Sequence, residues 1–293
     1  MRRLIGSELL KLRTLPTWWV TGAAMAGAAV LLALWNSWQA HTFMQPFEDY
    51  LSGAILTPRE EMSAEQVGTM RELWETQSAP GRIAATLYTS GQSFGLLLSG
   101  VVAVLLVTNE YHYRTLTATF LVAPRRGRVV AAKLVAVVLS SAGLWLVATL
   151  GSVLVGGVFL TTRGAGLGLG RGDVLGAVLL NLAAYMVWGV FGFGLGVLIR
   201  SQTAATVTAV VLYFLSSVVV AFAFQVLHDL VLEKDWVLQA QVLLPGVASQ
   251  IMTTPGELFA GAPASWTGAV VLVGYGLVGG FAGTLLLLRR DVV

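Results

Sequence analysis

The chain has 293 residues, of which 56% are hydrophobic and 11% are charged, and its mean hydropathy is +0.77. Soluble domains carry about 25% charged residues, so this composition excludes an ordinary soluble enzyme. It also excludes a nucleic-acid binder, although the sequence pI is near 9.4. The absence of cysteine removes disulfides, thiol nucleophiles and cysteine-based metal sites. The sequence therefore predicts an all-α, polytopic membrane protein.

Six long windows of the sequence contain no Asp, Glu, Lys or Arg. Each of them exceeds the roughly 20 apolar residues that cross about 30 Å of hydrocarbon. We expect a single transmembrane domain over residues 1–293 with six transmembrane helices, at about residues 17–38, 87–108, 134–160, 175–199, 204–225 and 266–288.

Two alternatives to this topology have to be weighed. The first span resembles a signal peptide because it follows a basic start, but its apolar run continues to Trp35. That run is longer than a signal-peptide core of about 7–15 residues, which favours an uncleaved anchor. The second alternative is a seventh span at residues 236–256, which are also free of charge. This segment, however, contains three glutamines and Pro245. We expect a surface helix or a re-entrant segment there, because such polar groups are costly in lipid.

The distribution of charge predicts the orientation of the chain. An even number of spans puts both termini on one side, and that side carries 12 basic and 3 acidic residues, against 6 basic and 12 acidic residues on the other. Because Lys and Arg accumulate on the cytoplasmic side, we expect a multi-pass plasma-membrane protein with both termini in the cytoplasm. Residues 39–86 and 226–265 are then extracytoplasmic, and residues 109–133 form a cytoplasmic loop.

Helices are also expected outside the membrane. In residues 1–16, leucines alternate with basic residues up to Pro16, which predicts an amphipathic interface helix on the inner leaflet; a simple basic flank is the alternative. In the long outer loop, Thr57, Pro58 and Glu60 fit the first positions of a helix. An apolar stripe follows at helical spacing, formed by Val67, Met70, Leu73 and Trp74. External helices are thus predicted before the second and the sixth spans.

The glycine-rich segment Gly164–Gly172 resembles a nucleotide-binding loop only superficially. No strand precedes it, no Lys-Ser or Lys-Thr pair follows it, and the topology places it outside. A phosphate cradle needs backbone amides that lead into a helix with that lysine. We interpret the segment as a flexible hairpin between two spans, and no Walker A pattern occurs elsewhere in the chain.

The six predicted spans contain no Asp, Glu, Lys, Arg or His. Ion-coupled pumps usually keep such residues inside the membrane, and an intramembrane hydrolase needs acid–base groups or a metal. We therefore expect no catalytic residue, no cofactor site and no metal site on this chain. Glycines spaced four residues apart, such as Gly192 and Gly196, predict close packing of the spans.

The cytoplasmic loop at 109–133 is the most informative segment. Glu110 and Arg114 form an i,i+4 pair that starts a short helix, and Pro124 ends it. A positive-inside flank accounts for the basic cluster that follows, Arg125, Arg126, Arg128 and Lys133. It does not account for Glu110, the only acidic residue in an internal cytoplasmic loop of this topology. This pattern predicts a docking surface for another protein.

These residues also resemble those of a known family. The pieces Glu110-Tyr111, Arg114-Thr115, Pro124-Arg125-Arg126 and Ala132-Lys133 resemble the cytoplasmic loop of type 2 ABC exporter permeases. The start Glu8-Leu-Leu-Lys-Leu-Arg13 and the Leu244-Pro245-Gly246 piece are similar to the same family. His112 departs from the pattern because it stands where the family usually has arginine.

The resemblance implies two permease copies, as a homodimer or heterodimer, on two separate ATP-binding subunits that bind ATP and Mg²⁺. Residues 110–124 would form the coupling helix, and the first segment the interface helix. The implied interface with the ATPase subunit comprises Glu8, Lys11, Glu110, Tyr111, Arg114, Thr115, Pro124, Arg125 and Arg126.

The leading hypothesis is therefore a permease subunit of an ATP-driven exporter, with an amphiphilic, lipid-like, drug or peptide cargo. An uncharged interior rich in aromatic residues and glycine suits such a cargo. One alternative is a membrane-embedded lipid-modifying enzyme, for which His41 with Glu48, or His228 with Asp229, are the candidate groups. Another is a structural or sensory membrane subunit.

Overall fold

The computed structural model describes residues 1–14, 16–54, 62–113, 115, 126–199, 201–215, 220–227, 235–253 and 261–289. Every regular element within these ranges is a helix, which confirms the predicted all-α class. The helices are α1 (Arg2–Thr14), α2 (Pro16–Phe43), α3 (Phe47–Ala54), α4 (Ala64–Ser78), α5 (Pro80–Tyr88), α6 (Gln92–His112), α8 (Arg126–Thr162), α9 (Gly172–Ile199), α10 (Gln202–Phe214), α11 (Val220–Leu227), α12 (Asp235–Ala240), η4 (Gln241–Leu243), α13 (Pro245–Thr253) and α14 (Ser265–Arg289).

Five stretches among the described residues are long and apolar enough to cross a membrane. They are Trp18–Phe43, Pro80–His112, Gly127–Thr162, Gly172–Ile199 and Ser265–Ala282. These five overlap the first four predicted spans and the sixth. In the predicted fifth span, 204–225, α10 has 13 residues, which is about 20 Å of helix. Residues 216–219 lie outside the described ranges, so the count of six spans remains a prediction.

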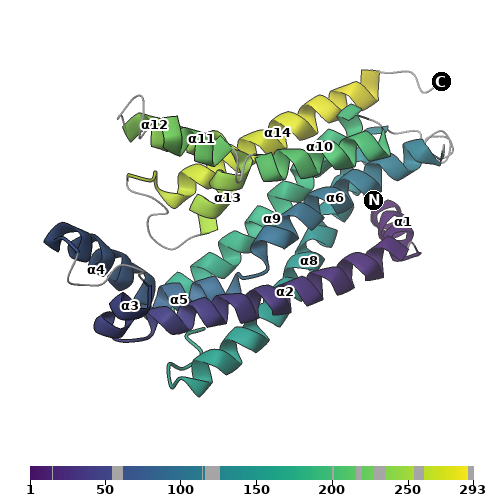
Figure 1. Cartoon of the computed structure of the whole chain (residues 1–293). Coiled ribbons are helices and arrows are strands. Elements are labelled where there is room, and N and C mark those ends of the chain that lie inside the picture. Colours follow the sequence, from purple (N-terminus) through teal and green to yellow (C-terminus); the bar gives the residue numbers. More distant parts are fainter. Residues whose placement is uncertain are drawn as a thin grey trace.

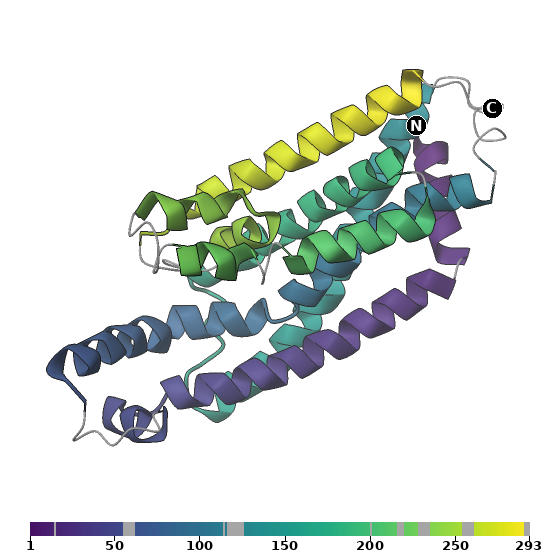
Figure 2. The ribbon, with the colours of Figure 1, turned by 45° about the horizontal axis from the view of Figure 1, so that its top comes forward.

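The long helices form one elongated bundle with α6 and α9 at its centre. Figure 2 shows α2 and α14 running along opposite sides of that centre. Helix α1 and the C-terminal end of α14 lie at one end of the bundle, and α3 and α4 lie at the other (Figure 1). The predicted interface helix at residues 1–16 and the predicted helix of the long outer loop therefore lie at opposite ends of the bundle.

The peripheral position of α2 agrees with its sequence. Trp18, Trp19, Trp35 and Trp38 all remain exposed on its surface. Trp18 and Trp35 are 17 positions apart, about 26 Å of helix. This separation suits the two aromatic belts of a membrane. Where α2 faces the bundle, it buries small residues, Ala29 and Ala33.

Glycine allows the central helices to approach closely. A Cβ atom placed on Gly192 would clash with the backbone oxygen of Gly100, and one on Gly194 would lie 2.6 Å from the carbonyl carbon of Gly279. Gly192 thus faces α6, and Gly194 faces α14. These glycines therefore mark places where two helices of the same chain pack closely against each other.

We expect Gly192→Ala to destabilise the bundle by about 1–3 kcal/mol, because backbone atoms of α6 would have to move. Gly176→Ala is the matched control on the same helix, since a Cβ there meets no atom within 4 Å. Alanine is favoured over glycine in a helix by up to about 1 kcal/mol. Unfolding in detergent, followed by tryptophan fluorescence, should separate the two variants; equal stability would contradict the packing described above.

The predicted second span, 87–108, is not one uninterrupted helix. It begins inside α5, and Thr89, Ser90 and Gly91 separate α5 from α6. The Thr89 hydroxyl donates to the carbonyl of Ala85 at 2.8 Å, and the Ser90 hydroxyl donates to the carbonyl of Leu87 at 2.7 Å. Such local side-chain bonds compete with continued helix. Helix α6 then runs on to His112, four residues beyond the predicted end.

The outer apolar stripe lies on α4, as predicted, but α4 has a different start. Its N-cap is Ser63, which forms a reciprocal capping box with Gln66. The predicted start at Thr57–Glu60 lies outside the described residues. From the stripe, the Trp74 indole donates to the backbone oxygen of Gln45 at 3.2 Å. This bond holds α4 against the end of α2.

Within the predicted segment 236–256, of which residues 236–253 are described, α13 packs between α9 and α14. Ala248 and Met252 of α13 are buried, and a Cβ on Gly268 of α14 would clash with the Ala248 oxygen. Ser249 accepts a 2.7 Å hydrogen bond from the indole of Trp188. Trp188 lies 16 residues beyond the first residue of α9, which is about 24 Å along that helix. This depth favours the re-entrant alternative over a surface helix.

Candidate coupling site

A cluster of four charged side chains joins α1 to α6 and α8. The Lys11 ammonium lies 2.8 Å from Glu8 Oε1 and 2.6 Å from Glu110 Oε1. The Lys133 ammonium lies 2.8 Å from Glu8 Oε2 and 2.8 Å from the same Glu110 Oε1. Glu8 and Lys11 come from α1, Glu110 comes from the last turns of α6, and Lys133 comes from α8. We call these four residues the charge cluster.

The charge cluster is neutral and largely buried. The side chains of Glu8, Glu110 and Lys133 are each no more than 5% exposed, whereas that of Lys11 is 46% exposed. Burial by itself lowers the pKa of Lys11, but its hydrogen bonds to Glu110 and Glu8 outweigh burial and raise that pKa above the ordinary value. Glu110 Oε2 is also buried and has no hydrogen-bond partner among the described residues. The buried negative charge of Glu110 is therefore compensated by the ammonium groups of Lys11 and Lys133.

Helix α1 is fixed to the bundle both by charge and by a narrow apolar face, because Leu12 belongs to the core and Leu9 packs partly buried against it. Its buried residues are Glu8 and Leu12, whereas Leu10 is 60% exposed. The sequence predicts α1 correctly as a helix that ends before Pro16. It did not predict that one acidic residue of this helix, Glu8, faces inwards. Helix α1 can therefore move independently of α6 and α8 only if buried ion pairs break.

The remaining predicted interface residues lie where α6 ends and α8 begins. Tyr111 packs partly buried against the core, and the Thr115 amide donates to the carbonyl of Glu110 at 3.0 Å. Arg126 is the first residue of α8. Arg114, Pro124 and Arg125 lie outside the described residues, as do most residues of the predicted coupling helix. The contact of this segment with a partner stays a prediction.

Lys133 is the member of the charge cluster that was not predicted as a site residue. In the sequence it stands in a basic run that a positive-inside flank already explains. One difference separates it from the other basic residues of that run: it lies about two turns inside α8, beyond Arg128. A lysine at that position has to find an acidic partner or reach the membrane surface.

Comparison with known proteins identifies the family. The sequence model of the ABC-2 family transporter proteins matches residues 15–292. The chain belongs to the ABC-2 transporter family. Among curated proteins, none matches the sequence significantly. The match covers the five candidate spans and confirms the resemblance inferred from the cytoplasmic loop.

Membership of the ABC-2 family makes this chain a membrane-spanning transport subunit of an ABC transporter and not a catalytic enzyme. His41 Nδ1 lies 3.3 Å from the side-chain amide of Gln45, and His228 and Asp229 fall outside the described residues. In the part of the chain that the structure describes, no three His, Asp or Glu residues gather as metal ligands would.

Proposed function

We propose that this ABC-2 family chain is the permease subunit of an ATP-driven exporter. In this proposal it pairs with a second permease copy, identical or related, and the pair sits on two separate ATP-binding subunits that bind ATP and Mg²⁺. The paired spans form the path for an amphiphilic cargo, which is lipid-like, a drug or a peptide. The chain lies in the plasma membrane with both termini in the cytoplasm.

The observation that carries this proposal is the charge cluster. It connects α1 and the ends of α6 and α8 through three ion pairs between helices, and a fourth pair, Lys11–Glu8, lies within α1. Residues 113–126, which contain all but the first three residues of the predicted coupling helix (110–124), connect the last two of these helices. A partner that pushes on residues 113–126 therefore pushes on helices that cannot move separately without breaking buried ion pairs. This connection supports a transmission role for the charge cluster.

The same arrangement supports a two-state mechanism. Packed helices tend to have discrete arrangements. Closure of the ATP-binding subunits would shift α1, α6 and α8 together, and α9 would follow because it packs closely against α6 at Gly100 and Gly192. The absence of charged residues from the six predicted spans favours an amphiphilic cargo over an ion.

Transport by inverted membrane vesicles tests the proposal. Vesicles that contain this chain and its ATP-binding partner should accumulate a fluorescent cationic amphiphile, a neutral phospholipid analogue or a labelled peptide in an ATP-dependent way. Vesicles from cells that lack this chain should not accumulate that compound. If all three compounds enter both kinds of vesicle equally, the export proposal fails for these cargo classes.

A further inference from the structure

A cavity of about 330 Å³ lies at the end of the bundle opposite α1. It is a partly open cavity lined by the end of α2, by α4 and α5, by the end of α8 and by the glycine-rich loop that leads to α9. Apolar side chains dominate its lining: Phe43, Met44, Trp74, Ile83 and Leu160. Its volume is at the small end of the range of about 300–1,000 Å³ for ligand pockets. One hydrocarbon chain suits it better than a large ligand.

The walls of this cavity are held in place by their own contacts. On one side, Trp74 donates to Gln45 and its ring lies 5.8 Å from that of Phe47. On the other side, the Tyr88 hydroxyl donates to the carbonyl of Leu167. The loop around Leu167 takes left-handed backbone angles at Gly164, Gly166 and Gly168, which glycine adopts without strain. The predicted flexible hairpin is thus attached to α5, and the space behind it is preformed.

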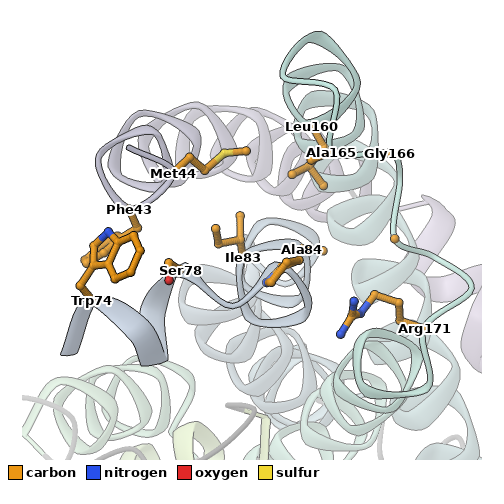
Figure 3. A pocket seen from close by; sticks show the side chains of 12 residues that line it. Phe43, Met44, Trp74, Ser78, Ile83, Ala84, Leu160, Ala165, Gly166 and Arg171 are labelled. Carbon is orange, nitrogen blue, oxygen red and sulfur yellow. The ribbon is translucent and has the colours of Figure 1, made fainter. Parts of the chain in front are cut away.

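A cation lies at one end of the apolar cavity. Figure 3 shows the Arg171 guanidinium pointing towards Ala84, with Trp74 and Phe43 at the opposite end. The lining contains no acidic residue. Arg171 donates two hydrogen bonds to Asp173, from Nε to Oδ1 and from Nη2 to Oδ2, each at 3.2 Å, and the two side chains are 51% and 43% exposed. This pair uses the edge of the guanidinium formed by Nε and Nη2, so Nη1 is the donor that remains for an anion from the cavity side.

The cavity lies near the level of the membrane surface. Trp35 and Trp38 on α2 are exposed and have the position expected for an aromatic belt. Phe43 lies five residues beyond Trp38, which is about 8 Å further along the helix. At this level an amphiphile has access both from the bilayer and from water.

We propose that this cavity binds one hydrocarbon chain of an anionic amphiphile, with its carboxylate or phosphate head on Arg171. The apolar walls take the chain, because hydrocarbon gains free energy when it leaves water. Arg171 selects the head group, because its Nη1 can donate a charge-assisted hydrogen bond to carboxylate or phosphate while Nε and Nη2 stay bonded to Asp173. This site is separate from the charge cluster. It does not depend on the export proposal, since binding at equilibrium needs neither ATP nor a partner.

Photo-crosslinking on the purified full chain in phosphatidylcholine nanodiscs tests this inference. The first probe is a free fatty acid with a diazirine in its chain, and the second is a phosphatidylglycerol with the same acyl group. Peptide mass spectrometry should find saturable adducts on α5 and on the loop at 163–171. Adducts from the fatty acid alone indicate entry from water, and adducts from the phospholipid indicate entry from the bilayer; either result supports the site.

Ser78→Trp fills the cavity without touching the buried core, because Ser78 lies at its edge on the last turn of α4. We expect the labelling to fall by about tenfold, which corresponds to about 1.4 kcal/mol. Ser52→Trp is the matched control. The Ser52 hydroxyl donates to Asp49 as that of Ser78 does to Glu75, and Ser52 does not line the cavity.

Arg171→Gln tests the head-group contact. It should weaken fatty-acid labelling by about tenfold, the effect of one charged hydrogen-bonding partner, and leave labelling by the matching fatty alcohol unchanged. Arg163→Gln is its control, because Arg163 lies over the Phe159 ring outside the cavity lining. The inference is overturned if labelling of the natural sequence does not saturate. It is also overturned if Ser78→Trp and Ser52→Trp label alike, or if Arg171→Gln weakens acid and alcohol equally.

Discussion

Replacing Glu110 with Gln is expected to lower the free energy of unfolding by about 3–5 kcal/mol. The substitution keeps the size of the side chain but leaves Lys11 and Lys133 with Glu8 as their remaining acidic partner in the charge cluster. Lys133 is 4% exposed and cannot reach water to compensate. Removing one partner from a buried pair is destabilising because the other charge stays buried.

Denaturant unfolding in micelles, followed by tryptophan fluorescence, measures this effect. A second substitution, Lys133→Met, should recover most of the loss, because it makes the charge cluster neutral again and replaces an ammonium by an apolar group. Arg71→Gln is the control. It breaks an ion pair with Glu75 whose side chains are 65% and 60% exposed, and it should cause no measurable change. Equal stability of Glu110→Gln and the control would show that the charge cluster does not stabilise the fold.

Cargo export per ATP hydrolysed is expected to fall by at least about tenfold in Glu110→Arg. A third cation beside Lys11 and Lys133 repels both, and it separates α1 from α6 and α8. Loss of about 1.4 kcal/mol in transmitted free energy already gives a tenfold change in rate. Hydrolysis by the ATP-binding subunits should persist, because their active sites lie on another chain in the proposed complex.

The ratio of transported cargo to hydrolysed ATP, measured in proteoliposomes, separates uncoupling from misfolding. A misfolded permease lowers transport because less complex forms, and the ratio for the complex that remains is unchanged. Should Glu110→Arg fail to insert, Lys11→Glu tests the same contact at the half-exposed member of the charge cluster. Glu75→Arg reverses an exposed charge at the opposite end of the bundle and should transport normally. A normal ratio in both cluster variants would exclude the transmission role.

The long spans could be predicted closely because the thickness of the bilayer sets their length. Helices α9 and α14 each begin within three residues of their predicted starts. The break between α5 and α6 was missed because it depends on side-chain hydrogen bonds of Thr89 and Ser90, which hydropathy does not register. The start of α4 was placed at Thr57 because its cap pattern resembles that of Ser63, and local sequence does not rank two such caps.

The candidate site could be predicted only in part, because local sequence identifies some of its residues but not the contacts between them. Glu110 was recognisable as an acid in a basic loop, and Glu8 and Lys11 were recognisable in the family-like start of the chain. That Glu110 is buried, and that it pairs with Lys133, depends on the packing of α1 and α6 against α8. The hydrogen bond from Lys133 to Glu8 joins residues that are 125 positions apart in the sequence. No local pattern contains that information.

Purification of this chain from its native membranes tests the central claim most directly. A permease of an ATP-driven exporter should copurify with an ATP-binding protein in a fixed stoichiometry. That protein should hydrolyse ATP, and it should be lost from the Lys11→Glu variant more easily than from Glu75→Arg. Repeated isolation of the intact chain in mild detergent without any ATP-binding protein would contradict the account.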